Sequence, residues 1–250
     1  MRLVKDLVER LPDGDVLDVC IGMHWTAVVV KVGGEKRCGL AATLGSGHSH
    51  HQGEPDVPKA GKLTGLPAVE LAHLALLDES TQTSVGLATI NALLPVEKEK
   101  FFEANAEEVI ANQGAGKKVV LVGHFPFTKR LAMRVGSLAV LEKNPGLTDY
   151  PADRAPDFIP NADVVAITGM TIPNYTLEGI LALCRPDAFV IILGPSTPLS
   201  PLLFDYGIDI ISGAQVEEID PVMRVVAEGG NFRQVHRAGV RLVNLQKMGG

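Results

Sequence analysis

The sequence predicts an α/β protein in which a small α+β domain, residues 1–95, precedes a Rossmann-like domain with a parallel sheet, residues 96–250. Two observations support this fold class. Three Val-rich runs bounded by Gly and Asp come first and are followed by helical patterns, which is an α+β arrangement. After residue 96, five short β-rich runs alternate with helical stretches, as in parallel sheets that are covered on both faces.

The first domain is predicted to open with an amphipathic helix within residues 1–15, where charged residues occur in every turn. Gly33 and Gly34 join the second and third strands and indicate a hairpin. The expected strands cover residues 16–22, 25–32 and 37–44, and the expected helices cover residues 66–80 and 84–94. Residues 45–63 are rich in Gly, Pro and His, so we expect a long loop there.

The second domain is predicted to begin with a helix over residues 100–114 that leads into the parallel sheet. The expected strands are residues 117–123, 137–143, 162–169, 187–194 and 208–213. The helical or turn segments between and after them are residues 127–136, 174–185, 200–207 and 220–230. Ser200 and Pro201 have the chemistry of an N-cap followed by proline at the first helical position, so the helix that follows explains both residues.

Composition and charge exclude several classes of function. The net charge is −6 and Lys and Arg are scattered, so we expect no nucleic-acid partner. The longest apolar runs are far shorter than the roughly 20 residues of a membrane span, so we expect no membrane association. Cys20, Cys38 and Cys184 are odd in number and form no CxxC pair, and we interpret them as small buried hydrophobes of a cytoplasmic protein.

Polar, glycine-containing segments follow four of the predicted parallel strands. They are VGHFPF at 122–127, ITGMTIPNYT at 167–176, LGPSTPLSP at 193–201 and SGAQ at 212–215. The carboxyl ends of parallel strands lie at one edge of a sheet, where ligands bind in such folds. A Gly at or next to each strand end allows the backbone to turn sharply or to admit a ligand. We therefore expect a small-molecule site at this edge.

The first of these segments does not have the glycine fingerprint of a dinucleotide site. His124, Phe125 and Pro126 stand where a pyrophosphate needs a bare glycine turn. Glu142 ends the second parallel strand, where Rossmann enzymes keep a ribose-binding acid. Without the glycine loop we interpret Glu142 as a solvated charge, and we expect no NAD.

The loop at 194–198 allows two interpretations, ligand contact or turn geometry alone. Its hydroxyl residues, Ser196 and Thr197, lie between two prolines that stiffen the loop, and a stiff loop suits a preorganised site. The polar residues of 167–176 on a neighbouring strand favour ligand contact. Asn174 or Thr176 in that segment also suits a helix cap, which is the alternative for them.

The histidines form two further candidate sites. In an extended segment His48 and His50 point to the same side, within reach of one metal ion, and imidazole suits Zn, Cu, Fe or Ni. The alternative is a solvated loop with no metal. His124 follows a strand end, beside any bound ligand, where it is either an acid–base group or a half-buried histidine with a structural partner.

The segments VGHFPF, ITGMTIPNYT and LGPSTPLSP, with GLAATL at 39–44, resemble the "putative heavy-metal chelation" family over nearly the whole chain. The resemblance implies an enolase-N-terminal-like first domain, a Rossmann-like second domain and a binding or active site in the cleft between them. It also implies heavy-metal or metallophore chemistry, so we expect a transition metal or a metal chelate at the site. Carried onto this chain, the cleft residues are Thr43, Gly123, His124, Phe125, Thr168, Gly169, Thr171, Asn174, Gly194, Ser196 and Thr197.

Three hypotheses of function follow. The first is a protein that binds a small polar or anionic ligand, or a metal chelate, in the interdomain cleft. The second is an enzyme for a small phosphorylated or nucleoside-like metabolite, with His124 as its catalytic acid–base group. The third is a subunit, for example of a homo-oligomer, whose cleft serves a partner protein. Hydroxyls and backbone N–H groups favour an anion or a prebound chelate over a bare soft metal, which prefers thiolates or several imidazoles.

Overall fold

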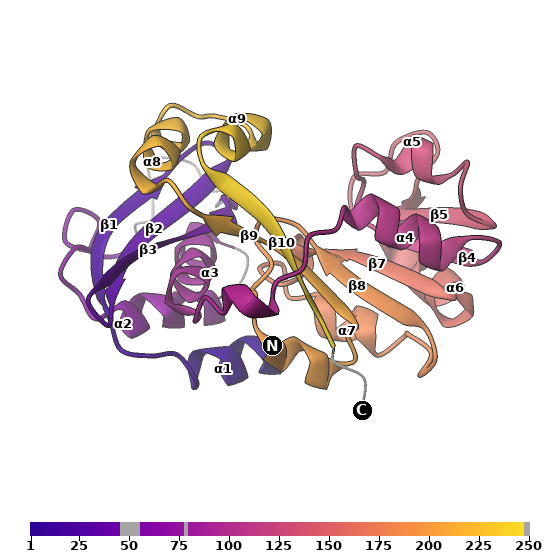
Figure 1. The fold of residues 1–250 in the computed structure, drawn as a ribbon, viewed down its shortest axis with the longest axis horizontal. Helices are drawn as coiled ribbons and strands as arrows, with labels where there is room; N and C mark the ends of the chain where they lie inside the picture. The colour runs from indigo at the N-terminus through magenta and orange to yellow at the C-terminus, as the bar shows by residue number, and fades with distance from the viewer. Residues whose placement is uncertain (46–55, 78–79, 248–250) are drawn as a thin grey trace.

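The computed structural model describes residues 1–45, 56–77 and 80–247 and contains two β-sheets (Figure 1). One sheet is antiparallel with three strands, in the order β1-β2-β3. The other has seven strands, in the order β10-β9-β8-β7-β4-β5-β6, and is parallel except for β10. The predicted fold class, an α+β part followed by a Rossmann-like parallel sheet, is confirmed.

The first sheet consists of the three strands expected from the Val-rich runs. They are β1 (Asp15–Ile21), β2 (Trp25–Val32) and β3 (Glu35–Ala42). Gly33 and Gly34 form the turn between β2 and β3, and both have positive φ, as a tight hairpin turn requires. The helix α3 (Thr81–Leu93) has Ser80 as its N-cap, with the Ser80 hydroxyl as the capping group. The helix packs directly on β3. The sheet therefore has one face that is covered by its own part of the chain.

The remaining helices of the first part are short. They are α1 (Arg2–Val8), α2 (Ala68–Ala72) and the 3-10 turn His73–Leu76. The opening helix is shorter than the predicted segment, since Asp13, Gly14 and the residues around them lead into β1.

The second sheet contains all five predicted strands and two edge strands. Its members are β4 (Lys118–Val122), β5 (Ser137–Glu142), β6 (Tyr150–Pro151), β7 (Val164–Thr168), β8 (Phe189–Leu193), β9 (Ile210–Val216) and β10 (Val240–Gln246). The central strands β4, β7 and β8 are apolar and buried over most of their length, as expected where both faces of a sheet are covered. The sheet is larger than predicted because β10 pairs antiparallel with β9 over seven residue pairs.

The helices of the second part are shorter than the predicted segments. They are α4 (Ala106–Gly114), α5 (Thr128–Leu131), α6 (Ala155–Phe158), α7 (Leu177–Leu181), α8 (Ile219–Ala227) and α9 (Phe232–Arg237). The segment after Ser200 is a 3-10 helix, Pro201–Tyr206. Ser200 is its N-cap, and its hydroxyl accepts a hydrogen bond from the Leu202 N–H at 3.4 Å, as predicted. Short 3-10 turns also occur at Lys98–Lys100, Ala152–Arg154, Ile159–Asn161 and Gly169–Thr171.

The two parts of the chain are interleaved. In Figure 1 the helices α8 and α9 lie beside the first sheet, although they come near the end of the chain. Their buried residues Val222, Val226 and Val235 form one hydrophobic cluster with Ala27 and Leu40 of that sheet. The first sheet is therefore enclosed by α3 on one side and by C-terminal helices on the other.

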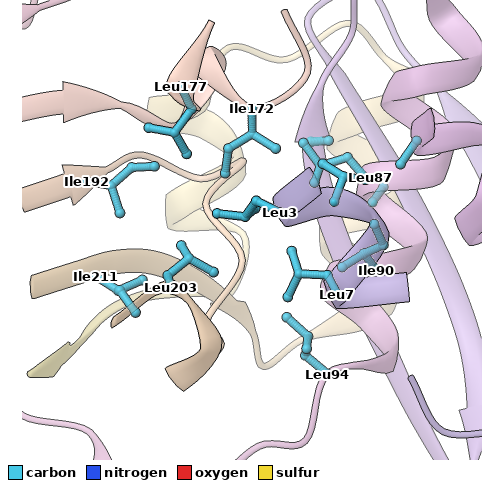
Figure 2. Packing of buried hydrophobic residues seen from close by; sticks show 14 of the residues in the cluster. Leu3, Leu7, Leu87, Ile90, Leu94, Ile172, Leu177, Ile192, Leu203 and Ile211 are labelled. Atoms are coloured by element: carbon cyan, nitrogen blue, oxygen red, sulfur yellow. The ribbon is translucent and has the colours of Figure 1, made fainter. Parts of the chain in front are cut away.

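A second cluster continues from the first part into the second (Figure 2). Leu3 and Leu7 of α1 belong to the same buried cluster as Ile90 of α3, Leu203 of the 3-10 helix Pro201–Tyr206, and Ile211 of β9. The Leu3 N–H also donates to Glu178 Oε1 at 2.7 Å. Helix α1 thus packs between α3 and the second sheet, so the two sheets share a continuous core.

Candidate ligand site at the carboxyl edge of the second sheet

A cavity of about 700 Å³ lies at the carboxyl ends of β4, β7 and β8, beside the middle of β9 and β10. Its volume is in the ordinary range for small-molecule sites. Six of the residues expected at the cleft line it, and they are His124, Phe125, Thr168, Gly169, Gly194 and Ser196. The strand-end segments that are far apart in the sequence therefore meet in space, as the parallel sheet predicts.

Glycines make room at this edge. Gly194 has φ +131°, a conformation that side-chain-bearing residues rarely adopt, so the turn out of β8 depends on glycine. A Cβ on Gly169 would lie 2.4 Å from Thr197 Oγ1, so the end of β7 and the loop after β8 approach too closely for any larger residue. Both glycines line the cavity, and both positions depend on the absence of a side chain.

Aromatic residues from separate parts of the chain line the cavity. Phe125 and Phe127, between β4 and α5, are stacked with ring centroids 5.2 Å apart and planes 8° apart. Trp25 at the start of β2 and Phe232 at the start of α9 form a second pair, 5.3 Å apart. The first sheet thus contributes to the cavity through Trp25, and α9 through Phe232.

The segment that carries Phe125 is held in place by hydrogen bonds and ion pairs. The Thr128 hydroxyl donates to the Phe125 carbonyl at 2.7 Å and accepts from the Phe125 N–H at 3.2 Å. Arg130 of α5 forms a two-point ion pair with the buried Glu107 of α4, with N–O distances of 3.0 and 2.6 Å. The Phe125–Phe127 pair therefore lies in a segment that hydrogen bonds and an ion pair hold in place.

A second cavity of about 400 Å³ adjoins the first. His124, Thr168 and Met170 line both. Its other lining residues are Val122, Gly123, Leu141, Glu142, Lys143, Asn144, Ala152, Ala155, Thr171, Asn174, Thr176 and Ile180. Three more expected residues, Gly123, Thr171 and Asn174, therefore lie around this smaller, more polar space.

His124 is paired with a carboxylate that the sequence analysis did not single out. Its Nδ1 lies 3.1 Å from Asp149 Oδ2, and the Asp149 side chain is only 4 % exposed whereas that of His124 is 47 % exposed. Asp149 also accepts from the Gly146 N–H at 3.1 Å. A fixed carboxylate on one ring nitrogen sets the orientation of the imidazole beside both cavities.

Glu142 holds the backbone at the end of β4. Its Oε2 accepts from the His124 N–H at 2.9 Å, and its Oε1 accepts from the Lys143 N–H at 2.8 Å. Both carboxylate oxygens therefore have backbone donors. Glu142 therefore positions the backbone of His124 after the end of β4. The interpretation of Glu142 as a solvated charge did not include this role.

Ser196 and Thr197 are both almost fully buried, 2 % and 1 % exposed, but their hydroxyls differ. Ser196 Oγ accepts from the Ala42 N–H of β3 at 2.9 Å and so ties the first sheet to the loop after β8. Thr197 Oγ1 finds no hydrogen-bond partner among the described residues. Of the two, only Ser196 lines the 700 Å³ cavity.

This difference predicts unequal costs for two matched substitutions. Ser196→Ala leaves the Ala42 N–H without its acceptor, so we expect a loss of about 1–2 kcal/mol in the free energy of unfolding. Thr197→Val replaces a hydroxyl that has no such role by a methyl group of similar size, so its cost should be smaller. Urea unfolding of both variants measures the difference, and an equal or reversed order would contradict the assigned role of Ser196.

The remaining expected site residues lie at or beyond the cavities. Thr43 Oγ1 forms a hydrogen bond with Thr26 Oγ1 at 2.9 Å and lies outside the lining of both cavities. The Thr171 hydroxyl donates to the Thr168 carbonyl at 2.7 Å, and Asn174 Oδ1 accepts from the Thr176 hydroxyl at 2.6 Å. His48 and His50, the expected metal ligands, lie outside the described residues.

Several cavity residues were not expected from the sequence. They are Trp25, Asn105, Met170, Phe127, Phe232 and Asn244, together with Asp149 behind His124. For Trp25 the sequence held one indication, because it is the single tryptophan of the chain. Phe127 lies in the segment already singled out, whereas nothing in the local sequence around Phe232 or Asp149 indicates a site.

The described residues do not fit a bare metal ion. Within residues 1–45, 56–77 and 80–247, no three His, Cys, Asp or Glu side chains are grouped closely enough to hold one. The cysteines are also poor ligands, because burial raises the pKa of Cys38 to about 12 and that of Cys184 to about 11. A thiol with such a pKa remains protonated at neutral pH, whereas metals bind the thiolate.

The same pKa shifts predict the reactivity of the cysteines. At pH 8 roughly 1 in 1,000 Cys184 thiols and 1 in 10,000 Cys38 thiols are ionised, so both should react slowly with Ellman's reagent. Because the folded-state pKa values are raised, labelling of Cys184 should accelerate about tenfold per pH unit up to pH 11 while the fold persists. The measurement is the rate of thiol labelling as a function of pH, with and without guanidinium. Rapid labelling of Cys38 in the folded protein would contradict the prediction.

The fold and the cavity define a two-sheet α/β protein with a pocket at the carboxyl edge of a Rossmann-like sheet. The chain belongs to the family described as "Putative heavy-metal chelation", because sequence models of that description match residues 4–94 and 105–244. None of the helices in the part of the chain that the structure describes is long and apolar enough to cross a membrane.

Comparisons with individual proteins agree with this family. A crystal structure of a family member of unknown function from Desulfitobacterium hafniense DCB-2 is similar with a TM-score of 0.83, at 26% identity over 98% of each chain. A second, from Pyrococcus horikoshii, has a TM-score of 0.81 at 19% identity over 98% of each chain, which supports the fold alone. An uncharacterized protein from Methanocaldococcus jannaschii is 28% identical over 232 residues, 89% of this chain and 86% of the relative.

Proposed function

We propose that this protein binds a metal chelate or another small organic ligand in the cavity between the first sheet and the carboxyl edge of the second. The observation that carries this proposal is the 700 Å³ cavity, which is lined by the ends of β4, β7 and β8, by the middle of β9 and β10, and by Trp25 of the first sheet. The family description supports a metal as part of the ligand. The strand ends offer hydroxyl and backbone N–H groups, which suit a prebound chelate better than a bare soft metal, so the donor atoms would come from the ligand itself.

A cytoplasmic location is part of the proposal. Cys20, Cys38 and Cys184 are all free thiols, which suits a reducing compartment. The two-domain division at residue 95 also stays a proposal, supported by the separate sheets of the two parts.

The hydrogen bond between His124 and Asp149 favours a second candidate function. A carboxylate that orients an imidazole is the arrangement of a general acid–base pair, and His124 lines both cavities. The protein would then be an enzyme that transforms its ligand, with His124 as the catalytic group. Asp149→Asn would lower turnover of that ligand with little change in its binding, whereas a pure binding protein would show no turnover.

The test of the first proposal is calorimetric titration with Zn²⁺ alone, with zinc citrate and with zinc dipicolinate, alongside the fluorescence of Trp25. Because Trp25 is the only tryptophan and lines the cavity, binding there should change its emission. We expect a saturable heat and a matching Trp25 response with at least one chelate, and neither with Zn²⁺ alone at equal concentration. Binding of a chelate without any Trp25 response would contradict the proposed site.

A further inference from the structure

We propose that the ligand of this cavity carries a flat aromatic group, which is held between the Phe125–Phe127 pair and the Trp25–Phe232 pair. This inference rests on the proposed function, since it concerns the ligand of the same site. It goes further because it assigns a chemical class to a ligand that the family description leaves open.

Aromatic side chains are concentrated at this cavity. The chain has eight Phe and one Trp, and the cavity takes three of those Phe together with the single Trp. They come from the start of β2, the β4–α5 segment and the start of α9, three places far apart in the sequence. Their convergence on one cavity is therefore a property of the fold and not of local composition.

These rings are only partly buried, although Trp25, Phe125 and Phe127 also pack against the core. Trp25, Phe125, Phe127 and Phe232 all keep part of their surface exposed, whereas the core aliphatic residues are closed off. Aromatic faces prefer stacked or edge-to-face partners at centroid distances of about 4.5–7 Å. A planar ring in the cavity would supply such a partner to either pair.

The lining of the cavity carries little charge. Among the described residues that line the 700 Å³ cavity, His124 is the only titratable side chain. Burying a charged group without a partner is costly, so the body of the ligand should be uncharged. Its polar groups would lie near His124, Thr168 and Met170, where the larger cavity meets the smaller one with its hydroxyl, amide and charged lining residues. The two cavities together suit a ligand with an aromatic body and a polar end.

The experiment compares salicylate with cis-2-hydroxycyclohexanecarboxylate by ligand-observed NMR on the full chain. The two probes share a carboxylate, a neighbouring hydroxyl and one negative charge, and differ in aromaticity. We expect salicylate to bind at least tenfold more tightly than its saturated counterpart. Phe125→Leu and Phe232→Leu, one from each aromatic pair, should each weaken salicylate at least fivefold, whereas Phe158→Leu, which changes a phenylalanine outside the cavity, should leave it unchanged.

Each other outcome overturns the inference. Equal affinity for both probes, or salicylate binding that survives both cavity variants, would show that the aromatic pairs do not select the ligand. Absence of salicylate binding would also overturn it. In any of these cases a Trp25 response to zinc citrate would leave the proposed function standing, because that chelate has no aromatic group. Failure of every chelate would remove the proposed function itself.

Discussion

Replacement of Leu3 by alanine should destabilise the whole protein by about 2–5 kcal/mol. Leu3 is fully buried in the cluster that joins α1, α3 and the second sheet, so truncation leaves a cavity in the core that both parts share (Figure 2). The measurement is urea unfolding followed in parallel by Trp25 fluorescence, which reports on the first sheet, and by far-UV circular dichroism, which reports on the whole chain.

The unfolding midpoints measured by the two signals should shift together to lower urea concentration, because the two sheets share their core. The matched control is Leu147→Ala, since Leu147 is fully exposed and its truncation should change stability by less than about 0.5 kcal/mol. Two separate transitions, with only one of them shifted by Leu3→Ala, would contradict the shared core.

Replacement of Gly39 by alanine should be of similar severity, about 3 kcal/mol, for a different reason. Gly39 lies in β3 under helix α3, and a Cβ there would be 2.1 Å from the Ala88 carbonyl oxygen and 2.3 Å from the Ala92 nitrogen. Both are backbone atoms, so the helix must move away from the sheet to admit the methyl group. Thermal or urea unfolding measures the loss.

Gly179→Ala is the control for this substitution. Gly179 lies within α7 and its added methyl group would meet nothing within 4 Å. Alanine has a higher helix propensity than glycine, by up to about 1 kcal/mol, so this variant should be slightly more stable than the parent chain. If Gly39→Ala were tolerated as well as Gly179→Ala, the close packing of α3 on β3 would be wrong.

Much of the fold could be predicted because its signals are local. The Val-rich runs became β1, β2 and β3, the five apolar runs became central strands of the second sheet, and Ser200 with Pro201 begins a helical segment as expected. The lengths of the helices were less predictable. The segments at 127–136 and 174–185 form helices of only four and five residues, because the remainder of each consists mainly of turns and bends.

The site was predictable only in part. The strand ends of a parallel sheet must meet at one edge, so His124, Thr168, Gly169 and Gly194 could be grouped from the sequence alone. Trp25 and Phe232 reach the same cavity through the packing of the first sheet and α9 near that edge, which no spacing in the sequence encodes. Likewise, the hydroxyl of Ser196 looked like a ligand group, but it already accepts from the Ala42 N–H across the two parts of the chain.

The central claim is that any metal reaches this protein inside an organic ligand that occupies the aromatic cavity. The most direct measurement is native mass spectrometry combined with elemental analysis of untagged protein, purified under reducing conditions without chelators. We predict that bound metal is accompanied by the mass of an organic ligand, and that Phe125→Leu with Phe232→Leu removes both together. A stoichiometric metal ion with no organic mass, retained in that double variant, would contradict it.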